Sequence, residues 1–219
     1  MDDFPRPIAT VDVALFTLRE GALCVLLSRR EREPYAGQFA LPGGFVHVDE
    51  DADTAATAAR VLAQKAGVAR PYLEQLYTFS GKVRDPRGWS IAVAYYALVP
   101  ETRLGAPAAG VALVHVDRLP ALPFDHERIV ATALYRLRGK STYSALPAYL
   151  LPDQFTIQEL HQVYEQVIGV RLDKASFRRK IEDQEIVEPV AGERRGGAHR
   201  PAQLYRLRTD RKVEFERKI

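Results

Sequence analysis

Cysteine is nearly absent from this chain, since Cys24 is the only one among 219 residues. A lone cysteine excludes an internal disulfide, which argues against a small secreted scaffold and favours a reducing compartment. Long hydrophobic runs are also missing: the apolar stretch 91–100 has about half of the roughly 20 residues that cross a bilayer. The start of the chain carries Asp2 and Asp3 and lacks the basic-then-apolar pattern of a secretory signal. We therefore expect a cytoplasmic protein that does not enter a membrane.

Excess charge is small as well, because 31 lysines and arginines stand against 28 acidic residues. The excess lies in one part of the chain. Residues 1–138 contain 16 basic and 16 acidic side chains, whereas residues 139–219 contain 15 and 12. This asymmetry favours two modules, the second of which faces a polyanion.

The first module is organised around residues 34–68, which read as a strand, a Gly-Gly turn, an acidic loop and a helix. The alanine-rich run 55–63 consists mostly of strong helix formers. Asp53 or Thr54 can cap this helix at its start, and Gly67 stands where a helix closes with a left-handed residue. The segment therefore predicts a helix that follows directly on an acidic loop.

The spacing within this stretch resembles the signature of Nudix hydrolases. In that family the loop carries a glutamate, and the helix reads Arg-Glu-aliphatic-x-Glu-Glu-x-Gly-aliphatic. Glutamates three and four residues apart share one helix face, where they hold Mg²⁺ against a diphosphate so that the metal activates a water. The matching positions here are Arg30, Pro34, Gly37, Phe39, Leu41, Pro42, Gly43, Gly44, Arg60, Leu62, Gly67 and Val68.

The frame of the signature is present, but its metal ligands are not. Val61, Gln64 and Lys65 stand at the glutamate positions counted back from Gly67. The exchange removes three negative charges and adds a positive one. A lysine ammonium repels a metal ion by roughly 4 kcal/mol per unit charge pair at 4 Å and an effective dielectric of about 20. We therefore expect no catalytic residue, no bound metal or other cofactor, and no enzyme activity.

The acidic loop leaves one alternative open. Glu50 keeps the family's loop position when counted from Gly44, but Ala52 takes it when counted from Gly67, because the loop is two residues longer than the family spacing. A substitute metal site with residual hydrolase activity could be built from Asp49, Glu50, Asp51 and Asp53. A solvated acidic loop is the favoured interpretation.

The rest of the first module reads as a sheet followed by a helix. Asp125 caps a helix from His126 to about Arg138. The fold class expected is α+β, with a Nudix fold (a mixed sheet flanked by helices) in residues 1–139 and a winged helix-turn-helix domain in residues 140–219. Strands are predicted at 7–18, which alternates as a half-buried strand does, and at 22–29, 72–79, 90–99 and 110–116.

The second module has the order helix, turn, helix, hairpin, which is typical of a winged helix-turn-helix. Thr156 caps the first helix, which ends near Gly169. Asp173 caps the second, whose sequence KASFRRKIEDQEI covers residues 174–186. Two strands, 186–190 and 203–207, flank a glycine- and arginine-rich wing.

The second helix stands in the recognition position. Phe177 and Ile181 form its buried stripe, and Ala175 and Arg179 lie opposite them. Arginine reads guanine bidentately in the major groove. The alternative is a solvated basic face on a module that docks protein. The residues expected to contact double-stranded DNA are Lys174, Ser176, Arg178, Arg179 and Lys180 on the helix, and Arg194, Arg195 and Arg200 on the wing.

Together the two modules resemble the Nudix-related transcriptional regulators of the NrtR family over nearly the whole chain. The resemblance implies a dimeric repressor of NAD-biosynthesis or salvage genes, which ADP-ribose or a related nucleotide releases from a palindromic operator. Related members control pentose catabolism instead, so the regulon stays open. The similar segments are YLEQLYTF (72–79), RDPRG (84–88), VAYYALV (93–99), LPFDH (122–126), FRRK (177–180) and RPAQLYRL (200–207).

Three arginines are candidates for binding the diphosphate of such a ligand. Arg30 stands at the end of a strand that faces the turn of Gly43 and Gly44, where a guanidinium can hold phosphates bidentately, and both glycines are candidate ligand-binding residues too. Arg84 and Arg87, on the polar loop between two strands, could do the same.

Aromatic and histidine candidates are more open. Phe39 or Tyr77 could stack on an adenine, with a role in the core as the alternative for each. For His47 and His126, a capping or solvated role is favoured over ligand contact. Two other functions remain as alternatives: an active ADP-ribose or nucleoside-diphosphate-sugar hydrolase with an accessory domain, and an interaction protein that does not bind DNA.

Overall fold

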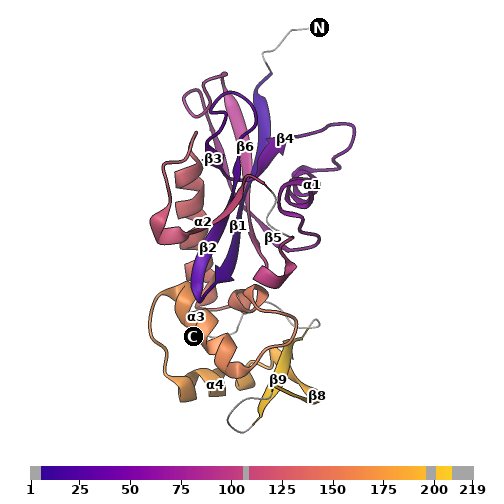
Figure 1. Ribbon diagram of the computed structural model, residues 1–219, viewed down its shortest axis with the longest axis vertical. Coiled ribbons are helices and arrows are strands. Elements are labelled where there is room, and N and C mark those ends of the chain that lie inside the picture. Colours follow the sequence, from indigo (N-terminus) through magenta and orange to yellow (C-terminus); the bar gives the residue numbers. More distant parts are fainter. Residues whose placement is uncertain (1–5, 106–108, 196–200, 209–219) are drawn as a thin grey trace. The chain divides into compact units, whose positions relative to one another are not determined.

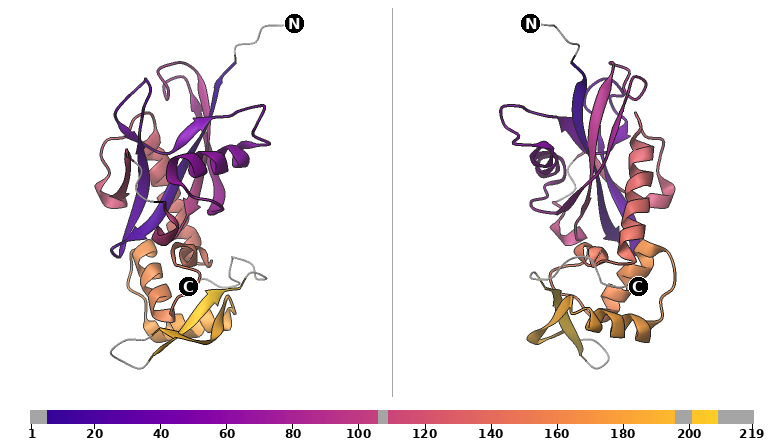
Figure 2. Two further views of the ribbon diagram at one scale, coloured as in Figure 1. Left: turned by 45° about the vertical axis from the view of Figure 1, so that its right-hand side comes forward. Right: turned by 180° about the vertical axis from the view of Figure 1, so that it is seen from behind.

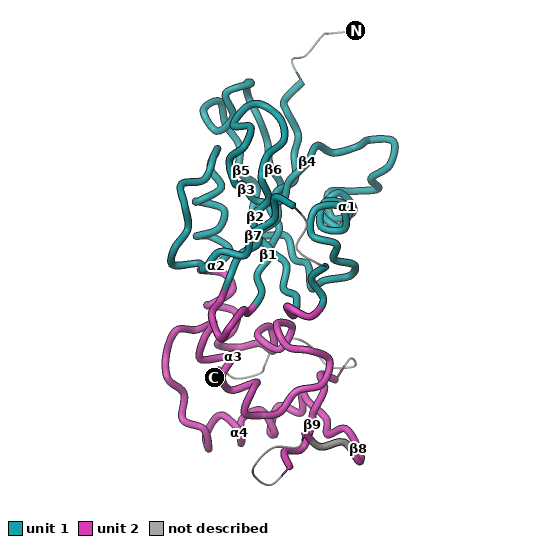
Figure 3. The backbone as a smooth tube through the Cα atoms, in the orientation of Figure 1, with its two compact units in different colours: residues 1–17, 24–99, 103–134 teal, residues 18–23, 100–102, 135–219 magenta. Residues whose placement is uncertain are grey.

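The structure is a computed structural model, and it describes residues 6–105, 109–195 and 201–208 (Figure 1). The chain separates into two compact units, which Figure 3 colours separately. The domain boundary expected after residue 139 stays a prediction. Unit 1 comprises residues 1–17, 24–99 and 103–134, and unit 2 comprises residues 18–23, 100–102 and 135–219.

Unit 1 contains a sheet and two α-helices. The end of β1, the start of β2, most of η1 and the last residues of α2 belong to unit 2. The elements are β1 (Ile8–Arg19), β2 (Ala22–Arg29), β3 (Phe39–Ala40), β4 (Gly43–Phe45), α1 (Thr54–Ala66), β5 (Tyr72–Gly81), β6 (Ser90–Leu98), the 3₁₀ turn η1 (Glu101–Arg103), β7 (Val111–His115), η2 (Val116–Arg118) and α2 (His126–Ser141).

The sheet of unit 1 has the order β3-β2-β1-β6-β5, with β4 also paired to β1 and β7 to β2. β1 runs parallel to β6, whereas β4 pairs with β1, β3 and β7 pair with β2, and β5 pairs with β6 in the antiparallel direction. The sheet is therefore mixed, which confirms the predicted fold class.

Helices α1 and α2 cover opposite faces of this sheet (Figures 1 and 2). Val13 and Leu15 of β1 pack with Leu62 of α1 in one hydrophobic cluster. The intervening residues of β1 point to the other face, and residues 11–17 are all buried. The prediction of a half-buried first strand is therefore wrong, because each face of the strand has its own helix.

Local signals explain where α1 begins and ends. Asp53 accepts a hydrogen bond from the backbone N–H of Ala56 at 2.8 Å, which satisfies one free donor of the first turn. Gly67 closes the helix in the left-handed conformation, with φ of 64°. The predicted helix and both of its caps are confirmed, and they fix which side chains of α1 face the sheet.

Unit 2 contains the helix-turn-helix and a hairpin. A buried cluster that includes Phe155, Leu160, Tyr164, Phe177 and Ile181 joins its helices. None of the described helices is both long and apolar enough to cross a membrane. The elements that follow α2 are η3 (Leu146–Leu150), α3 (Ile157–Ile168), α4 (Lys174–Asp183), β8 (Val187–Arg195) and β9 (Ala202–Leu207).

The predicted caps of α3 and α4 are also confirmed. Thr156 and Glu159 form a reciprocal capping box at the start of α3, and Gly169 ends that helix with φ of 82°. Asp173 caps α4 by accepting from the N–H of Ser176 at 2.9 Å. α4 ends at Asp183, three residues earlier than predicted, and Glu185 then takes a positive φ of 48°.

Candidate functional site

Unit 1 carries an open cleft of about 580 Å³. Its walls come from β1, β2, β4, α1, the loop between β5 and β6, and the first residue of α2. Seven of the lining residues are lysine or arginine and four are aspartate or glutamate. The balance of charge therefore favours an anionic ligand.

Gly43 and Gly44 line the cleft, and a side chain at either position would crowd its neighbours. β4 pairs with β1 so that Gly43 lies opposite Asp12 and Gly44 opposite Val11. A Cβ on Gly43 would come within 2.2 Å of the Asp12 carboxylate, and one on Gly44 within 3.1 Å of Val61. The two glycines thus let a strand pass directly over a buried carboxylate.

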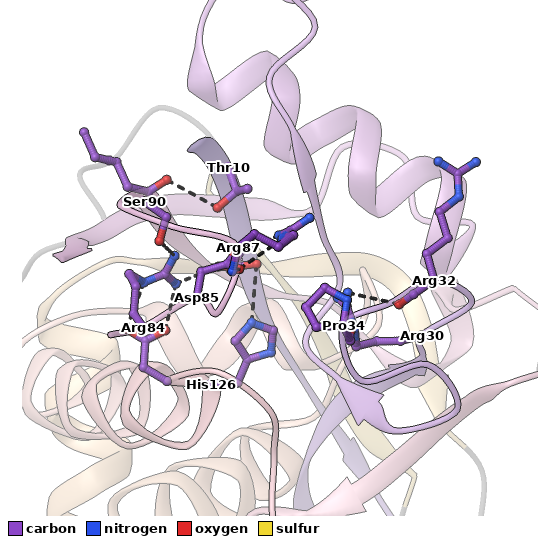
Figure 4. Close-up of polar contacts among 12 residues, drawn as sticks. Thr10, Arg30, Arg32, Pro34, Arg84, Asp85, Arg87, Ser90 and His126 are labelled. Carbon is purple, nitrogen blue, oxygen red and sulfur yellow. Dashed lines mark hydrogen bonds and ion pairs between the residues drawn. The ribbon is translucent and has the colours of Figure 1, made fainter. Parts of the chain in front are cut away.

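Arg84 lies at the centre of a largely buried ionic network in the wall of the cleft (Figure 4). Its guanidinium binds Asp125 bidentately at 2.7 and 3.1 Å and donates to Ser90 at 3.2 Å. Asp12 lies 3.6 Å away on another side. Burial by itself would lower the pKa of Arg84, but the hydrogen bonds to Asp125 outweigh it and the pKa is raised. The guanidinium is therefore held charged and largely occupied by protein partners.

His126 is buried beside this network, with 3% of the residue exposed. Its Nδ1 accepts a hydrogen bond from the backbone N–H of Leu41 at 3.0 Å, so the proton sits on Nε2, which faces Asp12 at 3.6 Å. Burial lowers the pKa of His126, which favours the neutral ring. The capping or solvated role expected for His126 is wrong, whereas His47 is exposed as expected.

Two arginines that line the cleft stack on aromatic rings. Arg30 lies over the ring of Phe124 with 4.8 Å between guanidinium carbon and ring centroid, and Arg87 lies over Phe45 at 5.2 Å. Arg30 also donates to the carbonyls of Pro34 and Arg32 (Figure 4). Arg87 also donates to the Asp85 carboxylate at 2.7 and 3.0 Å, so both guanidinium groups have a fixed orientation, which is what recognition of a planar or anionic ligand requires.

α1 brings the three substituted signature positions to the same cleft. Val61, Gln64 and Lys65 all line it. Lys65 donates from its ammonium to the carbonyl oxygen of Gly43 at 2.8 Å. Burial of the ammonium lowers its pKa, with Arg30 adding to the shift. A cation of the protein thus stands where a metal-binding helix would present carboxylates.

The acidic loop has a structural role through Asp51. Its carboxylate accepts from Arg60 at 2.6 and 2.8 Å and also from Thr57 and the N–H of His47. The hydrogen bonds from Arg60 hold the pKa of Asp51 well below its usual range. Within residues 6–105, 109–195 and 201–208, no group of three His, Cys, Asp or Glu side chains is placed to hold a metal ion.

α4 presents the candidate recognition surface of unit 2. Phe177 and Ile181 are buried, as the helical periodicity predicts. Arg178 is engaged within the helix by Glu182 at 2.9 Å. The residues on the other faces are Lys174, Ser176, Arg178 and Arg179, which are exposed, and Lys180, which is partly exposed.

The wing is described in part. Arg195 at the end of β8 forms an ion pair with Glu159, the capping-box residue of α3. This contact ties the hairpin to the start of α3. Arg200 and the side chain of Arg194, both predicted to contact DNA, lie outside the described part of the structure.

Comparison with known proteins assigns a domain family to most of each unit. The NUDIX domain family matches residues 7–133, and the NrtR DNA-binding winged helix domain matches residues 147–207. The "ADPR responsive transcriptional repressor NtrR" of Acinetobacter baylyi is 40% identical over 94% of this chain and 84% of its own length. The chain belongs to the NrtR family.

Solved structures of the NrtR family agree with this assignment. The crystal structure of Shewanella oneidensis NrtR complexed with a 27mer DNA is 36% identical, covers 96% of this chain and 99% of its own, and superposes with a TM-score of 0.90. The NUDIX domain of the same protein, complexed with ADP ribose, is 38% identical over 61% of this chain and 90% of its own, with a TM-score of 0.56.

Within this NrtR fold, the structure gathers most of the predicted ligand residues and separates two of them. Arg30, Gly43, Gly44, Arg84 and Arg87 line the cleft, whereas Phe39 and Tyr77 are not among its lining residues. Arg29 stacks on Phe39, and Tyr77 packs edge-on against Phe79. Their binding roles, like those of the DNA-contact residues, stay predictions.

Sequence reasoning missed the aromatic rings that do line the cleft, Phe45 and Phe124. Phe45 follows the Gly-Gly pair directly, and its 50% exposure marks it as a residue that no core packing explains. The position of Phe45 next to the motif was the available signal. No comparable sequence signal marked Phe124, because Arg30, the residue that stacks on its ring, is distant in the sequence.

Proposed function

We propose that this chain is a transcriptional repressor that holds operator DNA with α4 and the β8–β9 wing and releases it when ADP-ribose or a related nucleotide fills the cleft of unit 1. The observation that carries this proposal is the likeness over 94% of the chain to a repressor whose name states that it responds to ADPR. The cationic cleft and the exposed basic face of α4 supply the chemistry that each partner needs.

The cleft suits a nucleoside diphosphate without a metal. Arg30, Arg87 and Lys65 bring three cationic groups to one opening, and the rings of Phe45 and Phe124 offer apolar faces beside them. Phosphate oxygens accept hydrogen bonds from guanidinium and ammonium groups directly. Binding therefore does not require Mg²⁺.

The same cleft is proposed to bind without hydrolysing. Catalysis in this fold needs carboxylate oxygens to hold Mg²⁺ and generate a nucleophilic water. Val61, Gln64 and Lys65 supply none, and Asp51 of the acidic loop is already bound by Arg60. An active ADP-ribose hydrolase is the alternative, which those three residues and Asp51 disfavour.

The regulator is proposed to act as a homodimer in the cytoplasm. Two recognition helices related by a two-fold axis would read half-sites about one helical turn apart, or a multiple of it, so the operator should be palindromic. Genes of NAD metabolism are the proposed targets, with genes of pentose catabolism as the alternative.

A gel shift tests the proposal. DNA from upstream of this protein's own gene and of neighbouring genes is incubated with the full chain, with and without ADP-ribose. A specific complex that ADP-ribose dissolves is expected. The absence of any specific complex would remove the DNA-binding function, and a complex that ignores ADP-ribose and related nucleotides would remove the sensing function.

A further inference from the structure

The turn between α3 and α4 is held by side chains of α3 that have no role in the proposed function. α3 ends at Gly169, and Asp173 caps α4, so the residues between them must set the direction in which the recognition helix leaves. Residues 170–173 form no helix or strand of their own. Their backbone needs other partners to hold one conformation.

Leu172, the residue before the cap, has both of its backbone polar groups held by side chains of α3. Its N–H donates to Oε1 of Glu165 at 2.9 Å. Its carbonyl oxygen lies 2.9 Å from Nε2 of His161. A carbonyl oxygen can only accept, so Nε2 of His161 carries the proton and donates.

His161 and Glu165 can act together because they stand one turn apart on α3. His161 is buried, with 5% of the residue exposed, and the side chain of Glu165 is 15% exposed. Nδ1 of His161 lies 3.7 Å from Oε2 of Glu165. Both side chains are therefore largely shielded from solvent where they contact the turn.

His161 also touches α4 itself. The imidazole ring packs edge-on against the ring of Phe177, with 5.1 Å between the two centroids. The ring of Tyr164 also packs against Phe177, with 5.0 Å between centroids. Phe177 belongs to the buried stripe of α4. His161 thus contacts both the peptide that precedes α4 and the face by which α4 packs.

We propose that His161 and Glu165 are positioning residues that set the entry angle of the recognition helix, so that its exposed side chains meet base edges in register. The inference rests on the proposed DNA-binding function of α4. Phosphate contacts tolerate a small rotation of a helix, whereas bidentate base contacts do not, because they depend on two aligned hydrogen bonds. Losing the clamp should therefore reduce binding to specific DNA more than binding to nonspecific DNA.

Paired substitutions separate the clamp from general stability. His161→Phe keeps the ring that packs on Phe177 but removes the donor, and His161→Gln keeps a donor at the Nε2 position. Glu165→Met removes the acceptor for Leu172, and Glu165→Gln keeps an acceptor oxygen. Gln162→Met, at an exposed position of the same helix, is the matched control.

The probe is a duplex that the wild-type full chain selects from a random-sequence pool, compared with a scrambled duplex of the same composition. Fluorescence anisotropy at one fixed salt concentration gives both affinities, and thermal melting of each full-length variant reports folding. We expect His161→Phe and Glu165→Met to lose about 10-fold or more in affinity for the selected duplex and to change less than about 3-fold on the scrambled one. The two glutamine variants should recover most of the loss.

The outcomes that oppose the inference are distinct. Wild-type affinity for the selected duplex in both His161→Phe and Glu165→Met overturns it. Equal losses on both duplexes, with lowered melting that the glutamine variants do not rescue, also overturn it, because the clamp is then only structural. If His161→Phe does not fold, Glu165→Met and Glu165→Gln decide alone. A wild-type chain that selects no sequence contradicts the proposed function instead, whatever the variants do.

Discussion

Lys65 donates from its ammonium to the carbonyl oxygen of Gly43, and this 2.8 Å contact joins α1 to the Gly-Gly turn in the wall of the cleft. A helix that bound a metal would offer carboxylates at this point. The chain instead offers a fixed cation, which can meet a diphosphate directly.

Replacing Lys65 tests that role. Lys65→Ala should weaken ADP-ribose binding by about 10- to 100-fold, because a charge-assisted hydrogen bond contributes about 1.5–3 kcal/mol. Calorimetry with the wild type should give the same affinity in Mg²⁺ and in EDTA. Lys82→Ala is the control, since Lys82 is exposed and does not line the cleft. A wild-type affinity that collapses in EDTA, or turnover of ADP-ribose at roughly 1–1000 per second, would falsify the metal-free reading of the site.

Arg84 should matter chiefly for stability. Arg84→Met removes the cationic partner of the largely buried carboxylates of Asp125 and Asp12. The free energy of unfolding should therefore fall by roughly 3–5 kcal/mol. Urea denaturation measures this loss. The matched control, Arg118→Met, changes an exposed arginine and should be nearly neutral. An Arg84→Met chain as stable as the wild type would show that the network is not needed for the fold.

His126 should make unit 1 sensitive to acid. Burial lowers its pKa in the folded chain below the value of about 6.5 of an exposed histidine, so the unfolded chain takes up a proton first as pH falls. Its contribution to stability is complete above about pH 6.5 and is lost as pH falls through the folded pKa.

The corresponding variant is His126→Asn, whose side-chain oxygen can still accept from the N–H of Leu41. Between pH 7.5 and 5.5 the free energy of unfolding should fall less in this variant than in the wild type. His47→Asn, an exposed histidine, should keep the wild-type pH dependence. Parallel pH dependences for all three proteins would contradict the assignment.

Substitutions in the recognition helix α4 should distinguish base contacts from phosphate contacts. Arg179→Ala should fold normally, because Arg179 is exposed, and should cost about 1–3 kcal/mol with relaxed preference at one position of each half-site. Lys174→Ala should weaken all sequences alike and lower the salt slope by about one. Phe177→Ala is the folding control, with an expected loss of roughly 3–5 kcal/mol of stability. Unchanged affinity and preference in a folded Arg179→Ala chain would assign α4 to protein docking.

Sequence patterns predicted the elements whose causes are local. The caps Asp53, Gly67, Thr156, Gly169 and Asp173 act on residues within a few positions, so reading the sequence placed α1, α3 and the start of α4. The early end of α4 at Asp183 was missed, because Gln184 and Glu185 are good helix formers and no glycine marks the stop.

Contacts between distant residues could not be predicted in the same way. The buried ring of His126 is satisfied by the backbone N–H of Leu41, 85 positions away in the sequence, which donates to it. Arg84 resembled a ligand-binding arginine on a polar loop, and only the fold shows that Asp125 and Asp12 surround it. Burial of both faces of β1 likewise depends on two helices that follow it in the chain.

The proposed function requires that one chain couple ADP-ribose binding to DNA release without consuming the ligand. ADP-ribose is titrated in EDTA into the full chain bound to a fluorescent duplex of its selected sequence, while phosphorus NMR follows the diphosphate. We expect the anisotropy to fall to that of free DNA and the diphosphate resonances of ADP-ribose to persist, with no resonance of a phosphomonoester product. DNA that stays bound at saturating ADP-ribose, or release that occurs only as Mg²⁺ is added and the diphosphate is cleaved, would contradict it.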